Sequence, residues 1–126
     1  MARPDLKRQR RGLAAYERGL WAETLAALWL MLRAYRIVGR RVKTRAGEID
    51  LIARRGGTLA FIEVKARGDV ESAAQALGAA QRERLMRAAS LFVAGRPRLQ
   101  ALDMRFDVML VAPRRWPRHI PDAWQA

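Results

Sequence analysis

Three polar residues near the middle of the sequence, Asp50, Glu63 and Lys65, have the types that metal-dependent hydrolysis of phosphodiesters uses. In that chemistry carboxylates hold Mg²⁺ or Mn²⁺, the ion polarises the phosphate and lowers the pKa of a bound water, and a lysine orients or activates the water. Thiolate zinc sites, cysteine nucleophiles and Ser-His-Asp triads are excluded, because the chain has no cysteine and its one histidine, His119, lies in a proline-rich tail. Any catalysis must therefore use carboxylates, lysine and arginine.

A Gly56-Gly57 pair separates the two extended segments that carry these residues. Two glycines between alternating segments predict a two-residue hairpin of type I′, because both central residues of that turn need positive φ. Counting outward from the turn places Asp50 directly opposite Glu63. Two like charges in that position are destabilising unless something neutralises them, and oxygen-only ligands favour a hard ion such as Mg²⁺ or Mn²⁺. We therefore assign Asp50 and Glu63 as candidate metal ligands.

The same strands also allow a purely structural interpretation. The count places Glu48 opposite Lys65, so a surface salt bridge between these two residues, with the other carboxylates solvated, would be an ordinary charged strand face. Alternation along a strand puts Glu48, Asp50, Ile52, Phe61, Glu63 and Lys65 on one face and leaves the other face wholly apolar, with Ile49, Leu51, Ala53, Ile62, Val64 and Ala66. In either interpretation Glu48 has a structural role.

The elements that must position these residues follow from periodicity and from turn residues. A proline-free stretch over 9–34 has apolar residues at helical spacing, and its second half is apolar all round, which indicates a core helix or one covered by a partner subunit. The predicted order is αβββαβ: a helix over 9–34, strands over 36–43, 47–55 and 58–66, a helix over 73–94 and a strand over 104–111. We expect one α/β domain over 1–112, with 1–9 as a flexible basic arm.

Residues 113–126 are predicted to form a tail that contains prolines and the tryptophans Trp116 and Trp124. These tryptophans could stack on bases of a single strand. The preferred interpretation is that they pin the tail to its own domain. Asp107, in the last predicted strand, is expected to support the packing of that strand.

The charge balance predicts a polyanionic partner. The chain carries 25 Lys and Arg against 12 Asp and Glu, a formal net charge of +13, which favours DNA, RNA or anionic lipid, with nucleic acid as the leading candidate. Arg41, Lys43, Arg45 and Arg84 are candidate phosphate contacts, although a solvated basic surface would look the same. The longest apolar run is too short to cross a bilayer, so we expect no membrane partner and a cytoplasmic location.

Three segments of the sequence carry a family resemblance: GEIDLIA over 47–53, FIEVKAR over 61–67 and RFDV over 105–108. They resemble the YraN family of endonuclease-like proteins, and the likeness covers nearly the whole chain. That family is similar to archaeal Holliday junction resolvases and, by resemblance, to the PD-(D/E)XK nuclease superfamily. The resemblance implies a restriction-endonuclease-like fold, a mixed central sheet flanked by helices.

The resemblance also assigns roles to single residues. The superfamily's aspartate corresponds to Asp50 and its Glu-x-Lys to Glu63 and Lys65, while the helix glutamate of resolvase-like members corresponds to Glu23, which becomes a third candidate metal ligand. Glu23 could equally be a water-holding base or a residue at the helix rim. Gln81 occupies a helix position where related sequences often have lysine, so we expect a weaker phosphate contact there. The motif's proline is replaced by Ile49.

These observations predict a metal-dependent endonuclease that hydrolyses phosphodiester bonds in DNA, with branched or junction DNA as a possible substrate. The resemblance further implies a homodimer, because resolvase-like relatives cut symmetric substrates in pairs. Two alternatives remain open: a non-catalytic nucleic-acid-binding protein that retains the nuclease fold, and an RNA- or ribosome-associated basic protein with incidental carboxylates. Metal-dependent cleavage separates the first from the others.

Overall fold

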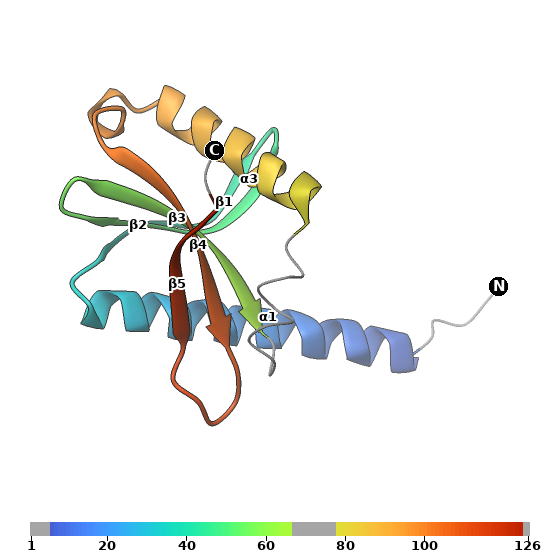
Figure 1. The fold of residues 1–126 in the computed structure, drawn as a ribbon. Helices are drawn as coiled ribbons and strands as arrows, with labels where there is room; N and C mark the ends of the chain where they lie inside the picture. Colours follow the sequence, from blue (N-terminus) through green and yellow to red (C-terminus); the bar gives the residue numbers. More distant parts are fainter. Residues whose placement is uncertain (1–5, 67–77, 125–126) are drawn as a thin grey trace.

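A mixed sheet lies between two helices in the computed structural model, which describes residues 6–66 and 78–124 (Figure 1). The elements are α1 (Leu6–Leu32), β1 (Arg36–Thr44), β2 (Gly47–Arg55), β3 (Thr58–Ala66), α3 (Ala79–Ala94), the short 3-10 helix η1 (Pro97–Leu99), β4 (Asp103–Val111) and β5 (Arg118–Trp124). The sheet has the order β1-β2-β3-β4-β5; β3 and β4 are parallel and the other neighbours antiparallel. This confirms the α/β class and the αβββαβ order, and it is consistent with a restriction-endonuclease-like core.

Each face of the sheet is buried under one helix. On the α1 side, Ala26 and Leu30 pack against sheet residues that include Ile62. On the α3 side, Ala89 and Phe92 are part of the cluster around Phe61 and Phe106. A sheet that is covered on both faces needs nearly continuous apolar strands, which explains the composition of β3 and β4.

The predicted apolar strand face is largely confirmed, since four of its six residues pack on the α1 side, but the placement of Ile49 on that face is wrong. Ile49 packs in the α3-side cluster with Ile52, whereas Leu51 and Ala53 pack on the α1 side. Because Ile49 and Leu51 lie on opposite sides of the sheet, the alternation along β2 changes phase at Asp50. Both faces are therefore apolar over most of their length, and polar residues gather near this change of phase.

The β2–β3 hairpin has the predicted two-residue loop, closed by the pair Arg55 and Thr58. Its turn is not of type I′, since Gly56 has φ 59° but Gly57 is not in the positive-φ region. Positive φ at the first central residue alone is the type II′ pattern, which also suits a hairpin. The register is therefore as predicted, although the turn differs.

The ends of the helices differ from the sequence prediction. Helix α1 begins at Leu6, so residues 6–9 of the expected flexible arm are helical, while residues 1–5 lie outside the described part of the chain. Helix α3 spans Ala79–Ala94 after Gly78, and residues 73–77 of the predicted helix also lie outside it. Within the described residues, no helix has the length and apolar character that crossing a membrane would require.

Half of the expected tail, residues 118–124, is a fifth strand. Strand β5 pairs antiparallel with β4, and the buried Trp124 ring stacks on Phe106 with 5.7 Å between centroids. Pro121 is tolerated because β5 is an edge strand. The prediction that the tryptophans pin the tail is confirmed for Trp124; Trp116 remains largely exposed, with its ring 5.5 Å from that of Trp29.

Candidate active site

The candidate site lies where β2 and β3 separate. Paired residues run from the hairpin to Leu51 opposite Ile62, and at the next position the side chain of Asp50 takes the place of backbone pairing. Asp50 Oδ2 accepts a hydrogen bond of 2.9 Å from the backbone N–H of Val64. Strand β3 meanwhile stays paired with β4 as far as Ala66. The carboxylate of Asp50 is thus held at the C-terminal end of β3, which is the outer end of this strand.

Glu63 and Lys65 meet Asp50 at this end of β3, as predicted. The ammonium Nζ of Lys65 lies 3.5 Å from Glu63 Oε1, and the side chains are 19% and 16% exposed. Gln81, at the start of α3, donates a hydrogen bond of 3.2 Å to the same Glu63 oxygen. Gln81 of α3 therefore helps to orient the carboxylate of Glu63.

The two carboxyl groups perturb each other. Burial, followed by the negative charge of Asp50, raises the pKa of Glu63 to about 7, and Lys65 offsets part of this rise. Burial also raises the pKa of Asp50, while its hydrogen bond from Val64 opposes the change. A hydrogen bond between the two carboxyl groups favours ionised Asp50 and protonated Glu63. Without a counter-ion, the pair therefore tends to retain a proton near neutral pH.

Glu23 reaches the edge of the site from α1. It is buried, and its negative charge contributes to the raised pKa of Asp50. Both of its oxygens are engaged: Oε1 accepts from Arg40 Nε at 3.3 Å and Oε2 from Arg41 Nε at 2.9 Å. Arg40 also donates to Thr24. The structure thus brings Glu23 near the pair but shows it neutralised by two arginines.

The donor set at Asp50 and Glu63 fits a divalent cation. Among the described residues, no group of three Asp, Glu, His or Cys side chains is arranged to hold a metal. Mg²⁺, however, is usually held by one or two carboxylates and keeps several waters. The adjacent carboxyl groups of Asp50 and Glu63 meet that requirement.

Glu48 has a different partner from the one predicted. It lies 3.9 Å from Arg41, whereas the ion pair of Lys65 is made with Glu63. The positive φ of Arg41, 50°, interrupts the regular alternation of β1 and turns its side chain toward Glu23 and Glu48. Glu48 therefore contacts Arg41 of β1 and not, as predicted, Lys65 of β3.

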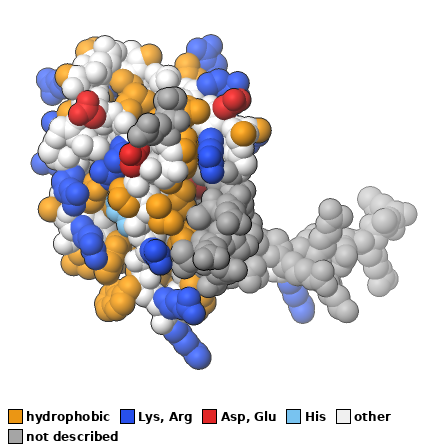
Figure 2. Space-filling view, in the orientation of Figure 1, with side chains coloured by type: hydrophobic (Ala, Val, Ile, Leu, Met, Phe, Trp, Pro, Cys, Tyr) orange, Lys and Arg blue, Asp and Glu red, His pale blue; other side chains and the backbone are white. Residues whose placement is uncertain are grey.

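The remaining predicted phosphate contacts surround the site. Lys43 and Arg45 lie at the β1–β2 hairpin, where Lys43 pairs with Glu48. Arg84 of α3 lies against Gly47, which has φ 143°, so closely that a Cβ there would be 3.0 Å from Arg84 Cδ. Lys and Arg side chains outnumber Asp and Glu over the face drawn in Figure 2. The basic residues thus extend from the site toward the hairpin tip.

A second polar cluster joins β4 to β5 and was not predicted. The fully buried Asp107 accepts bonds of 2.9 and 2.8 Å from Arg105, one of 3.0 Å from the Asp122 N–H, and contacts His119 Nε2 at 2.6 Å. Arg105 also donates to the hydroxyl of Tyr35 at 2.7 Å. The Arg-x-Asp spacing on a strand was the only signal, because the contact with His119 depends on β5. This arrangement agrees with the expected structural role of Asp107.

Comparison with known proteins gives a family but no activity. A family model described as "Uncharacterised protein family UPF0102" matches residues 22–111. A UPF0102 protein of Parvibaculum lavamentivorans is 59% identical over 90% of this chain and 86% of its own length. Those of Caulobacter vibrioides and Methylorubrum extorquens are 53% and 49% identical, over 93% and 98% of this chain and 94% and 96% of theirs. These matches support the family part of the resemblance; none of these names states a nuclease superfamily or a substrate.

Proposed function

The chain belongs to the uncharacterised protein family UPF0102, and from the carboxylates and the lysine at the outer end of β3 we propose that it is a metal-dependent endonuclease that hydrolyses phosphodiester bonds in DNA. The proposal includes membership of the PD-(D/E)XK superfamily, branched or junction DNA as substrate and a cytoplasmic location.

One observation carries the proposal. The carboxyl groups of Asp50 and Glu63 lie together at the point where β2 leaves β3, Asp50 bonded to the Val64 N–H and Lys65 3.5 Å from Glu63. A purely structural pair of carboxylates would be costly in this half-buried position, since burial and mutual repulsion both disfavour the charged forms. A cation-binding role explains why such a pair is kept next to a lysine.

Each side chain has a defined task in the proposed reaction. Asp50 and Glu63 would hold Mg²⁺ or Mn²⁺, and the bound ion would supply the positive charge that polarises a phosphate and lowers the pKa of a water. The Val64 N–H fixes Asp50, and Gln81 fixes Glu63, so neither carboxylate must reorganise. The ammonium of Lys65 stabilises the negative charge that develops on the phosphate, or orients the water.

The decisive experiment measures cleavage of labelled linear, single-stranded and four-way-junction DNA with Mg²⁺, Mn²⁺ or EDTA. We expect metal-dependent cleavage that Asp50→Asn and Glu63→Gln each reduce by at least about 100-fold. Asp103→Asn is the matched control, because it removes an exposed carboxylate at the opposite end of β3. Cleavage that survives both site variants would refute the assignment.

A non-catalytic nucleic-acid-binding protein is the second candidate. The ion pairs of Glu23 favour it, because both oxygens of one proposed ligand already have arginine partners. This function predicts equal DNA binding in EDTA and in Mg²⁺, and no cleavage of any substrate. Tight binding without cutting in every sample would therefore replace the enzyme with the binding protein.

A further inference from the structure

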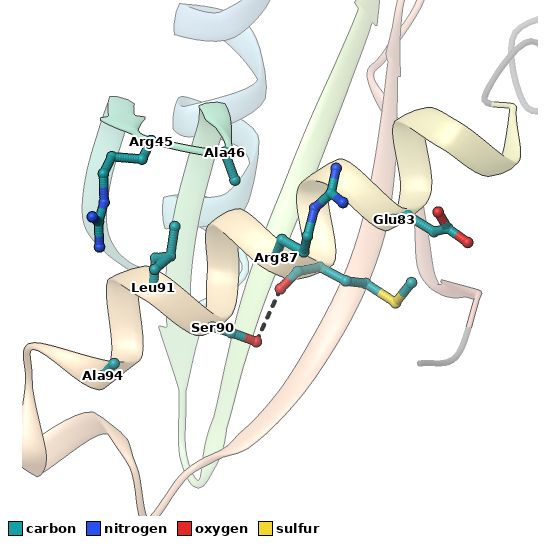
Figure 3. A pocket seen from close by; sticks show the side chains of 8 residues that line it. Arg45, Ala46, Glu83, Arg87, Ser90, Leu91 and Ala94 are labelled. Atoms are coloured by element: carbon teal, nitrogen blue, oxygen red, sulfur yellow. Dashed lines mark hydrogen bonds between the residues drawn. The ribbon is translucent and has the colours of Figure 1, made fainter.

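A groove lies between the β1–β2 hairpin and the outer side of α3 (Figure 3). Its volume is about 1060 Å³, and its apolar lining includes Ala46 from the hairpin and Met86 and Leu91 from α3. A second hollow of about 480 Å³ shares Arg45 and Leu91 with it. The two hollows therefore meet around the hairpin tip and form one extended depression.

The groove combines an apolar lining with basic margins. Arg45 and Arg87 are exposed and both line it, while the second hollow adds Lys43 and Arg96. In Figure 3 the carboxylate of Glu83 lies at the far end and points away from the two arginines. Leu91 is 39% exposed, so a large apolar side chain remains open between cationic groups. This combination suits an anion that carries a flat apolar group.

Helix α3 connects the groove to the candidate site. Gln81, which binds Glu63, and Arg84, which lies against Gly47, precede Arg87 on the same helix. At 1.5 Å of rise per residue, Gln81 and Arg87 are about 9 Å apart along the axis, or about three base steps at 3.4 Å. Six residues at 3.6 per turn also put the two positions about 120° apart around the axis, so a strand that contacts both must wrap around the surface of α3.

We propose that this groove binds unpaired nucleotides of the DNA substrate, so that a single-stranded arm enters the site from the hairpin side. The arginines contact its phosphates, and Leu91 and Met86 contact the face of a base. This inference rests on the proposed function for the identity of the substrate, and it narrows the substrate class to DNA with a single-stranded segment next to the cut, such as a flap or fork. A duplex would present only phosphates here and leave the apolar lining unused.

Binding in EDTA tests the groove without any need for cleavage. Fluorescence anisotropy would compare a labelled oligothymidylate of about 12 nucleotides with a blunt duplex of equal length, across a range of salt concentrations. We expect Arg45→Gln/Arg87→Gln to weaken single-strand binding about tenfold and to reduce the log–log salt slope by about 1.4, the value for two phosphate contacts. Binding of the duplex should weaken by a smaller factor than binding of the single strand in this variant.

The matched control removes two arginines at the other end of the sheet. Arg36 and Arg54 are exposed and line a separate hollow there, so Arg36→Gln/Arg54→Gln lowers the net charge equally. It should change single-strand binding less than about twofold. Leu91→Asn tests the apolar contact: single-strand binding should weaken about threefold or more with an unchanged salt slope.

Several outcomes would overturn the inference. Equal losses in the groove variant and the control would mean that binding depends on charge spread over the surface. Equal losses for single strand and duplex would make the groove a site for duplex phosphates, and an unaffected Leu91→Asn would remove the base contact. Thermal unfolding of each variant, which should match the wild type, excludes loss of fold as the cause.

Failure of the inference can be told apart from failure of the proposed function. If wild-type protein cuts linear and forked duplexes equally in Mg²⁺, the nuclease assignment holds and the groove proposal fails. If nothing is cut but the groove variants lose single-strand binding in EDTA as expected, the groove binds single strands and the nuclease assignment fails. Fork-selective cleavage that Arg45→Gln/Arg87→Gln reduces to the level of linear DNA would support both.

Discussion

The pairing of Asp50 with Glu63 was predictable because a two-residue turn fixes the register of a hairpin. The partner of Glu48 and the face of Ile49 were not predictable, since both depend on the irregular backbone near Asp50 and Arg41. Strict alternation of side chains along a strand was assumed from the sequence, and that assumption cannot predict where tertiary packing interrupts the alternation. The structure thus brings Asp50, Glu63 and Lys65 together as the pattern predicted, whereas the contacts of the neighbouring residues differ from prediction.

Glu63 should make the stability of the metal-free protein depend on pH. Its folded pKa is raised to about 7 from 4.5, so between these values the folded state binds more protons than the unfolded state. The free energy of unfolding contributed by this group is therefore fully present below about pH 4.5 and falls, by up to about 1.4 kcal/mol per pH unit, as the pH rises toward 7. Urea unfolding of wild type and Glu63→Gln in EDTA measures this difference.

Mg²⁺ provides the complementary control for Glu63. A bound cation favours the ionised pair, so Mg²⁺ should stabilise the wild type above about pH 7 and have little effect near pH 5. Glu63→Gln should show neither the pH slope nor the Mg²⁺ response. If the free energy of unfolding depends on pH in the same way in the wild type and in Glu63→Gln, the carboxyl pair does not cause the pH dependence.

Lys65 should affect the rate of cleavage far more than the binding of DNA. Lys65→Met removes the ammonium 3.5 Å from Glu63, and we expect single-turnover cleavage to fall by about 100-fold or more while DNA binding in EDTA changes only a few-fold. Because Lys65 lowers the pKa of Glu63, its loss should also shift the acidic limb of the pH–rate profile to higher pH. Lys65→Arg, which keeps the charge, should restore part of the rate. An unchanged rate in Lys65→Met would assign the residue to structure alone.

At the scale of elements, the sequence predicted strands better than helix ends. β2 and β3 have the predicted bounds, because glycines mark their ends, and β1 and β4 differ from prediction by one residue each. Strand β5 was missed because its prolines and short length resemble a tail. Its place in the sheet depends on long-range contacts from Asp107 and Phe106 that no local pattern shows.

Asp107 should therefore control the stability of β5. Asp107→Asn weakens the bonds with Arg105 and leaves its guanidinium without a full counter-charge, so we expect a loss of about 2–4 kcal/mol in the free energy of unfolding. Hydrogen exchange should increase first in β5. Asp122→Asn is the control, because that exposed side chain lies at φ 52°, which asparagine tolerates, and it should cost less than about 0.5 kcal/mol.

The contribution of Asp107 should also be lost in acid. Burial alone would raise its pKa, but the bonds with His119, Arg105 and the Asp122 N–H hold it below the ordinary value of 3.8. The lowered folded pKa means that this stability is present above about pH 4 and is lost as the pH falls through the folded pKa. Below that pH, Asp107→Asn and the wild type should converge in stability; a constant difference down to the acid transition would contradict the assignment.

At the scale of the whole molecule, two surfaces of different character coexist. The hairpin and α3 present basic residues beside the carboxylates, whereas the outer side of α1 carries exposed apolar side chains. Among these, Leu28 is 47% and Leu32 is 79% exposed. The apolar half of this helix was predicted either to be core or to contact a partner subunit; its inner side is core, and the exposed side is where a second copy would bind.

We expect a homodimer formed through this outer side of α1, and its response to salt should be opposite to that of DNA binding. Each chain carries a net charge of +13, so two copies repel each other, and screening of that repulsion should tighten the dimer as salt increases. The same salt should weaken DNA binding, because counterions compete for the phosphates. Sedimentation equilibrium at low and high salt measures the first effect.

Leu28→Glu should weaken the dimer at least about tenfold at either salt concentration, since it places a charge in the apolar contact. Met104→Glu, which alters an apolar residue 38% exposed on β4, should leave the dimer unchanged. A protein that stays monomeric at high salt would refute the interface. In that case, paired cleavage of a symmetric junction would require the DNA itself to bring two monomers together.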